Sequence, residues 1–191
     1  MVLAAREEDA ALIKMLALHG LSTDAWRRFS DEGYKHYQVI ASGFKYNMMD
    51  IQAAIGIHQL RRVEANWERR EQIWQRYTEA FSHLPLGLPS PPEPDTRHAY
   101  HLYTILVDEA RTGMTRDAFL EGMTAENIGV GVHYLSLPEH VYYQERFGWK
   151  PEHYPNAMRI GRATVSLPLS ARLTDDDVED VIRAVEKQIY P

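Results

Sequence analysis

A long apolar seam that ends in a run of prolines constrains the fold of this chain more than any other feature. Its apolar side chains recur at alternating spacings of three and four residues, which predicts one helix over residues 48–82 with a packed stripe. At about 1.5 Å per residue such a helix runs roughly 50 Å, long enough to link two layers or two subunits. The prolines of HLPLGLPSPPEPDTRH then end it, because proline lacks the N–H that a helix needs. The seam consists of Leu60, Val63, Trp67, Trp74, Tyr77 and Phe81, with Arg70 interrupting it.

The sequence on either side of this helix follows other patterns. Before it, MVLAA is strand-like, and REEDAALIKMLALHG has helical spacing and ends at Gly20. After it, strand and helix patterns alternate with short connections, which favours an α+β domain with a small, mostly antiparallel sheet covered by helices. The predicted class is α/β, and the predicted segments are residues 1–42, 43–84, 85–97 and 98–191.

The last of these segments carries several strand and helix signals. Thr115 and Thr174 are the expected N-caps of two helices, and three aspartates follow Thr174 in the first turn. The expected strands lie in residues 98–107, 128–134 and 165–169. The expected helices lie in residues 115–127, 139–148, 155–164 and 174–189.

Composition excludes several classes of protein. None of the 191 residues is cysteine, which removes disulfides, thiolate nucleophiles and cysteine-ligated metals. The net charge of −6 argues against nucleic acid as the main partner. No apolar run approaches the ~20 residues that cross a bilayer, and no signal peptide pattern is present. We therefore expect a cytoplasmic protein that binds neither nucleic acid nor membrane.

The stretch GFKYNMMDIQAAIG, residues 43–56, places polar groups directly before small apolar residues. Asn47 is the expected N-cap of the long helix. Together with Lys45 and the positive helix end, its amide could form an anion site. Alternatively, Lys45 is an ordinary exposed residue and Asn47 is only a cap. The residues alone leave both interpretations open.

A second polar cluster lies in GVHYLSLPEHVYY, which contains His133, Tyr134 and His140. Imidazole and phenol groups suit a site for a hydroxyl-rich or phosphorylated ligand, and the alternative is an aromatic edge of the core. The nine histidines of the chain do not form HExxH or a similar motif, so no metal site is predicted. A serine hydrolase is also not predicted, because no GxSxG motif is present and Ser166 lies in an expected buried strand.

Several stretches, taken in order, resemble the C-terminal half of the DegT/DnrJ/EryC1/StrS aminotransferases. They are GFKYNMMDIQAAIGIHQLRRVEANWERREQIWQRYTEAF, HAYHLYTILV, NIGVGVHYLSLPEHVYY, YPNAMRIGRATVSLPL and LTDDDVEDVIRAV. Within the family, GFKYN and the HGL…DAW loop are most similar to the enzymes that make the amino-arabinose of lipid A. The resemblance implies a fold-type I enzyme that uses pyridoxal phosphate (PLP). It also implies a homodimer that transfers an amino group, with glutamate as the expected donor, to a keto nucleotide sugar.

The resemblance also assigns site residues. The segment matching Lys45 and Asn47 approaches the PLP phosphate, and many members have asparagine and arginine at these two positions. It leaves open which of the two side chains makes the contact here. The segment matching His133, Tyr134 and His140 lies near the sugar nucleotide. Members often carry a further histidine where this chain has Pro138.

By the same resemblance, the lysine that holds PLP covalently precedes the position matching Met1. None of the lysines present lies in the matching Ser-x-x-Lys context, so these residues are expected to be unable to bond PLP by themselves. The lysines are Lys14, Lys35, Lys45, Lys150 and Lys187. The alternative hypothesis is a non-catalytic dimerisation or binding module derived from such an enzyme. A weaker third hypothesis is a histidine-ligated metal enzyme.

Overall fold

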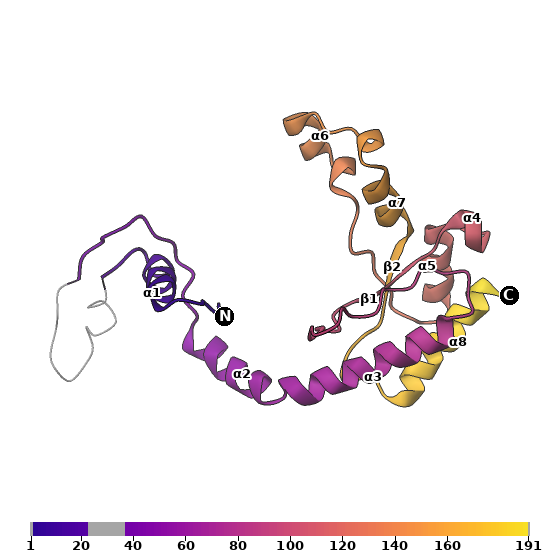
Figure 1. Cartoon of the computed structure of the whole chain (residues 1–191), viewed down its shortest axis with the longest axis horizontal. Helices are drawn as coiled ribbons and strands as arrows, with labels where there is room; N and C mark the ends of the chain where they lie inside the picture. Colours follow the sequence, from indigo (N-terminus) through magenta and orange to yellow (C-terminus); the bar gives the residue numbers. More distant parts are fainter. Residues whose placement is uncertain (1, 23–36, 191) are drawn as a thin grey trace. The chain divides into compact units, whose positions relative to one another are not determined.

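The computed structural model describes residues 2–22 and 37–190. It divides into two compact units, residues 1–61 (the N-terminal unit) and residues 62–191 (the C-terminal unit). The DAW part of the loop discussed above lies outside the described residues. The N-terminal unit contains α1 (Glu7–Leu16) and α2 (Asp50–Arg61) (Figure 1).

In the N-terminal unit, the chain after α1 pairs with the chain before α2. Isolated antiparallel bridges join Leu18 to Lys45 and Leu21 to Val39. Gly20 makes the close approach possible, because its φ of +68° is left-handed and a Cβ there would lie 1.9 Å from the carbonyl oxygen of Ala41. The stretch that begins at Gly43 is therefore held against the end of α1.

Three predictions for this part of the chain are wrong. Residues 2–5 lie in no strand, and the described residues offer them no partner strand. Asn47 is not a helix N-cap, because α2 begins only at Asp50. The N–H of Met49 instead donates to Oε1 of Gln52 at 2.9 Å, so the third helical side chain reaches back over the helix end.

The third wrong prediction concerns the long helix over residues 48–82, which is two helices. The second is α3 (Val63–Phe81), and Arg62 between them has φ −105° and ψ 2°, outside the helical range. The apolar seam is accordingly buried only in its second half. Trp74, Tyr77 and Phe81 are buried, whereas Leu60 and Val63 are exposed.

The C-terminal unit is built around a two-stranded antiparallel sheet, β1 (Tyr103–Leu106) and β2 (Thr164–Leu167). The register pairs Thr104 with Ser166. The strand expected in residues 128–134 is wrong. Only Gly131 pairs with β2, through two backbone hydrogen bonds to Ser166. The remaining elements are α4 (Glu109–Thr112), α5 (Arg116–Ala125), η2 (Leu137–Glu139), α6 (Val141–Phe147), η3 (Pro151–His153), α7 (Pro155–Ala163) and α8 (Asp175–Ile189).

Helices α3, α5 and α8 cover the sheet with one apolar core. Helix α8 contacts both α3 and α5, α7 contacts β1 and leads directly into β2, and α6 lies on an extension away from the sheet (Figure 1). The phenol of Tyr77 donates to the carbonyl oxygen of Pro168 at 3.0 Å, and burial raises its pKa. The completely buried side chains of this core include Tyr77, Phe81, Tyr103, Ile105, Phe119, Met123, Val165 and Val185.

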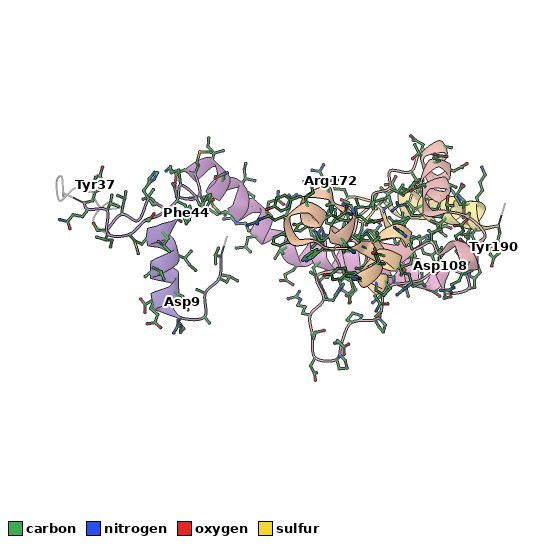
Figure 2. The ribbon with its side chains drawn as sticks, turned by 90° about the horizontal axis from the view of Figure 1, so that it is seen from above. Asp9, Tyr37, Phe44, Asp108, Arg172 and Tyr190 are labelled. Atoms are coloured by element: carbon green, nitrogen blue, oxygen red, sulfur yellow. The ribbon has the colours of Figure 1, made fainter. Side chains whose placement is uncertain are left out.

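The predicted helix starts in this unit are confirmed. Thr115 caps α5 through its side chain, and Thr174 forms a capping box with Asp177 at the start of α8. Asp108, labelled in Figure 2, caps α4 by accepting the N–H of Ala110 at 3.0 Å. Helix α8 is further held to α3 by Arg69, which donates to the carbonyl oxygen of Leu173 at 2.8 Å.

Replacing Thr174 by alanine is expected to lower the free energy of unfolding by about 1 kcal/mol, because it removes the acceptor for the N–H of Asp177. The hydrogen bonds from Thr174 lower the pKa of Asp177, so the contribution of the Asp177 carboxylate to the capping box is fully present above the ordinary aspartate pKa of 3.8. It is lost as the pH falls through the lowered pKa of the folded state. Urea unfolding at neutral pH and at pH 3 measures both effects.

Asp176→Asn is the matched control, since Asp176 lies in the same helical turn without a part in the capping box. It should lower the free energy of unfolding by only about 0.3 kcal/mol, the loss of one exposed charge near the helix N-terminus. Equal losses in the two variants would contradict a specific role of the Thr174 cap.

Candidate functional site

Lys45 and Asn47 lie on the segment that is bridged to the end of α1. The ammonium group of Lys45 donates to Oδ1 of Asn47 at 2.5 Å. This leaves the amide NH₂ of Asn47 and two ammonium protons of Lys45 as available hydrogen-bond donors. One positive charge and several donors on neighbouring side chains fit a phosphate group.

Asn47 also lines a groove of about 370 Å³ in the N-terminal unit, together with Lys14 and Tyr46. Its apolar lining comes from α1 and the residues on either side of it, including Ile13 and Ala17. Phe44, labelled in Figure 2, stacks on Tyr46 with ring centroids 5.3 Å apart. An aromatic wall, an apolar floor and polar groups at one edge are typical of small-molecule sites.

His133 and Tyr134 follow Gly131, the residue that pairs with Ser166 of β2, at the point where this segment turns away from that strand. Nδ1 of His133 lies 2.9 Å from Oγ of Ser166. A cis peptide bond joins His133 to Tyr134, and their rings meet edge to face with centroids 4.8 Å apart. His133 is half-buried and Tyr134 is exposed, so one ring is anchored and its neighbour faces outward.

His140 is positioned separately, as the residue immediately before α6. Its ring lies edge to face with that of Tyr143, at 6.2 Å. Within the described part of the chain, no interaction joins His140 to His133. The structure therefore brings His133 and Tyr134 together and places His140 at the far end of the turn that contains η2.

Three residues of this region were missed by the sequence analysis. Ser166 is the partner of His133, and Gly131 leaves room for its ring, because a Cβ there would lie 2.9 Å from Cε1. Glu139 accepts from Nε of Arg162 at 3.0 Å, while its Oε2 is buried without a partner among the described residues. The pairings of Ser166 with His133 and of Glu139 with Arg162 join residues more than twenty positions apart, so no local pattern signals them.

The contact between Ser166 and His133 does not make a hydrolase site. The Ser166 side chain is buried in β2, so no substrate carbonyl can reach its oxygen. The strand position predicted for this serine is confirmed. Within residues 2–22 and 37–190, no three histidine, aspartate or glutamate side chains are grouped to hold a metal ion. In the same residues no helix is long and apolar enough to cross a membrane.

Solved structures with this fold define the class. A protein from Streptococcus pneumoniae, Spr1654, described as a sugar aminotransferase, matches with a TM-score of 0.82 and 26% identity over 97% of this chain and 44% of its own. That structure is the pyridoxamine phosphate form. The PLP form of the same protein matches with a TM-score of 0.81. The chain thus has the α/β fold of the corresponding part of a PLP-dependent aminotransferase, which confirms the predicted fold class.

Two relatives resemble the chain more closely in sequence. The Methanocaldococcus jannaschii protein MJ1066 is 45% identical over 98% of this chain and 48% of its own length. The spore coat polysaccharide biosynthesis protein SpsC of Bacillus subtilis is 47% identical over 94% of this chain and 46% of its own length. The chain spans about half the length of the curated relatives that it matches.

The DegT/DnrJ/EryC1/StrS aminotransferase family matches residues 1–186. The chain belongs to this family, which confirms the resemblance drawn from its motifs.

Proposed function

We propose that this chain is the C-terminal part of a PLP-dependent enzyme that transfers an amino group from glutamate to a keto nucleotide sugar. The observation that carries the proposal is the family match over residues 1–186. In addition, this chain covers about half the length of each of two relatives. The product would serve polysaccharide, lipopolysaccharide or antibiotic-sugar biosynthesis. We propose the cytoplasm as its location.

Lys45 and Asn47 are the proposed phosphate contacts for PLP. They fit that group because they present one ammonium charge and an amide donor side by side. When bound, PLP supplies the electron sink on which amino transfer depends. The contribution of this chain is to bind and orient the phosphate from one side.

The sugar nucleotide is proposed to contact His133, Tyr134 and His140. The anchored His133 ring offers one hydrogen-bonding nitrogen, and the exposed phenol of Tyr134 offers a donor and an acceptor. Such groups suit the hydroxyl and carbonyl oxygens of a keto sugar. We further propose that the lysine bonded to PLP is none of the five lysines of this chain.

The test uses the longer protein of which we propose this chain to be a part. Incubation with PLP, glutamate and a 4-keto nucleotide sugar should cycle the visible absorbance of the cofactor to its amine form and back. Glutamate alone should stop the cycle at the amine form. A cofactor spectrum that never changes with either substrate would contradict the proposal.

Helix α2 supports a homodimer as the proposed assembly. The helix buries no side chain within its own unit, and it exposes several large apolar residues. These are Ile51, Ile55, Ile57 and Leu60. Exposed apolar surface of this kind marks an interaction site. The same exposed surface favours the second candidate function, a dimerisation module without catalysis. The absorbance test distinguishes the two, because only the aminotransferase should convert the cofactor to its amine form and back.

Replacing Ile55 by aspartate is expected to convert the proposed homodimer into a monomer, because the charge would be buried in the interface without a partner. Analytical ultracentrifugation measures the mass of the protein in solution. Tyr190→Asp, at an equally exposed apolar position, is the control and should remain a dimer. An Ile55→Asp variant that keeps the dimer mass would exclude this face of α2 from the interface.

A further inference from the structure

We propose that Ser166 is a positioning residue that fixes the neutral His133 ring with its proton on Nε2. His133 then presents a hydrogen-bond donor, and the substrate atom that it meets is an acceptor oxygen. The part about the substrate rests on the proposed function. The part about the ring depends only on this chain.

Ser166 is held more rigidly than the histidine that it contacts. It lies in β2 in register with Thr104, and its backbone N–H and carbonyl both bond to Gly131, at 2.7 and 3.1 Å. Only 4% of the residue is exposed. The Oγ atom is therefore a fixed point, and the 2.9 Å contact with Nδ1 fixes one edge of the His133 ring.

The direction of this hydrogen bond follows from the number of protons. A hydroxyl carries one proton, and His133 is the one side-chain partner of Ser166 in the described part of the chain. If Oγ of Ser166 accepted a hydrogen bond from Nδ1–H, the hydroxyl proton of Ser166 would be buried without an acceptor, which is costly. Ser166 therefore donates to Nδ1, and the proton of the neutral ring lies on Nε2.

The backbone of Gly131 restricts the His133 ring on a second side. A Cβ at this position would lie 2.9 Å from Cε1 of His133 and 3.5 Å from Nδ1. The ring therefore packs against bare backbone on the same segment that bonds to Ser166. The bond to Ser166 occupies Nδ1, and the Gly131 backbone packs against Cε1, so Nε2 is the nitrogen that remains to bond a ligand. A donor at Nε2 pairs with a carbonyl, hydroxyl or phosphate oxygen.

The first test is a two-bond ¹H–¹⁵N correlation spectrum of the 191-residue chain, at a pH where the imidazole is neutral. The His133 signals are assigned by their loss in His133→Gln. We expect a single Nε2–H tautomer, and the appearance of the Nδ1–H tautomer in Ser166→Ala and in Gly131→Ala. An Nδ1–H tautomer in the unchanged chain, or spectra of both variants that are the same as that of the unchanged chain, would overturn the proposal.

The second test is kinetic and uses the longer protein. Ser166→Ala should raise KM for the keto sugar by about three- to tenfold, with kcat changed by less than about twofold, because a binding contact is misaligned. Thr164→Val removes another buried hydroxyl from the same face of β2 and should leave both parameters unchanged. Equal effects of the two substitutions would reduce Ser166 to a structural role. Absence of amino transfer in the parent protein would refute the proposed function, while the spectra would still decide the tautomer.

Discussion

Phe81→Ala is expected to lower the free energy of unfolding of the C-terminal unit by about 3–5 kcal/mol. The side chain is completely buried near the end of α3. Its ring stacks on Tyr77 at 5.6 Å and meets Tyr103 edge to face at 6.4 Å. Its removal leaves a cavity between α3 and β1 that these two aromatic rings cannot fill without leaving their hydrogen bonds.

Urea unfolding followed by circular dichroism measures this loss. Phe147→Ala is the matched control, because that phenylalanine is 54% exposed on α6 and its ring meets Tyr143, Trp149 and the guanidinium of Arg146 outside the core. Its loss should cost about 1 kcal/mol or less. Similar losses in the two variants would mean that the core is not centred on the contact of α3 with the sheet.

Lys45→Ala is expected to weaken PLP binding by the longer protein about 10- to 100-fold. A charge-assisted hydrogen bond to phosphate contributes about 1.5–3 kcal/mol, and each 1.4 kcal/mol is a factor of ten. Asn47→Ala removes only a neutral donor, so about a tenfold loss or less is expected. The quenching of protein fluorescence by PLP measures both affinities.

Pyridoxal, which lacks the phosphate, provides the control ligand. Its binding should be the same in the unchanged protein, in Lys45→Ala and in Asn47→Ala. If Lys45→Ala weakens pyridoxal as much as PLP, the lysine does not contact the phosphate. If Asn47→Ala has the larger effect on PLP, the roles of the two residues are reversed.

Local signals in the sequence were sufficient where a helix end is determined by its own side chains. Thr115 and Thr174 cap α5 and α8 as predicted. In each case the threonine hydroxyl accepts the helical N–H three residues later, so the cap needs no residue from elsewhere in the chain. The same reasoning failed for Asn47. Its amide is bonded by Lys45, and Gln52 covers the end of α2 instead.

Where pairing depends on distant residues, the sequence was not sufficient. The apolar spacing continues through Arg62, a good helix former, so nothing local marks the break between α2 and α3. The glycine-rich residues 128–134 have strand-like composition, yet only Gly131 reaches β2. The site shows the same limit. The motifs pointed to His133, whereas the partner of its ring, Ser166, lies 33 residues away.

We propose that these residues bind PLP and its sugar substrate from one side and supply no covalent link to the cofactor. Reduction with borohydride of the 191-residue chain mixed with PLP, followed by peptide mass mapping, tests it most directly. We expect no stoichiometric pyridoxyl group on Lys14, Lys35, Lys45, Lys150 or Lys187. A stoichiometric pyridoxyl group on any one of them would contradict it.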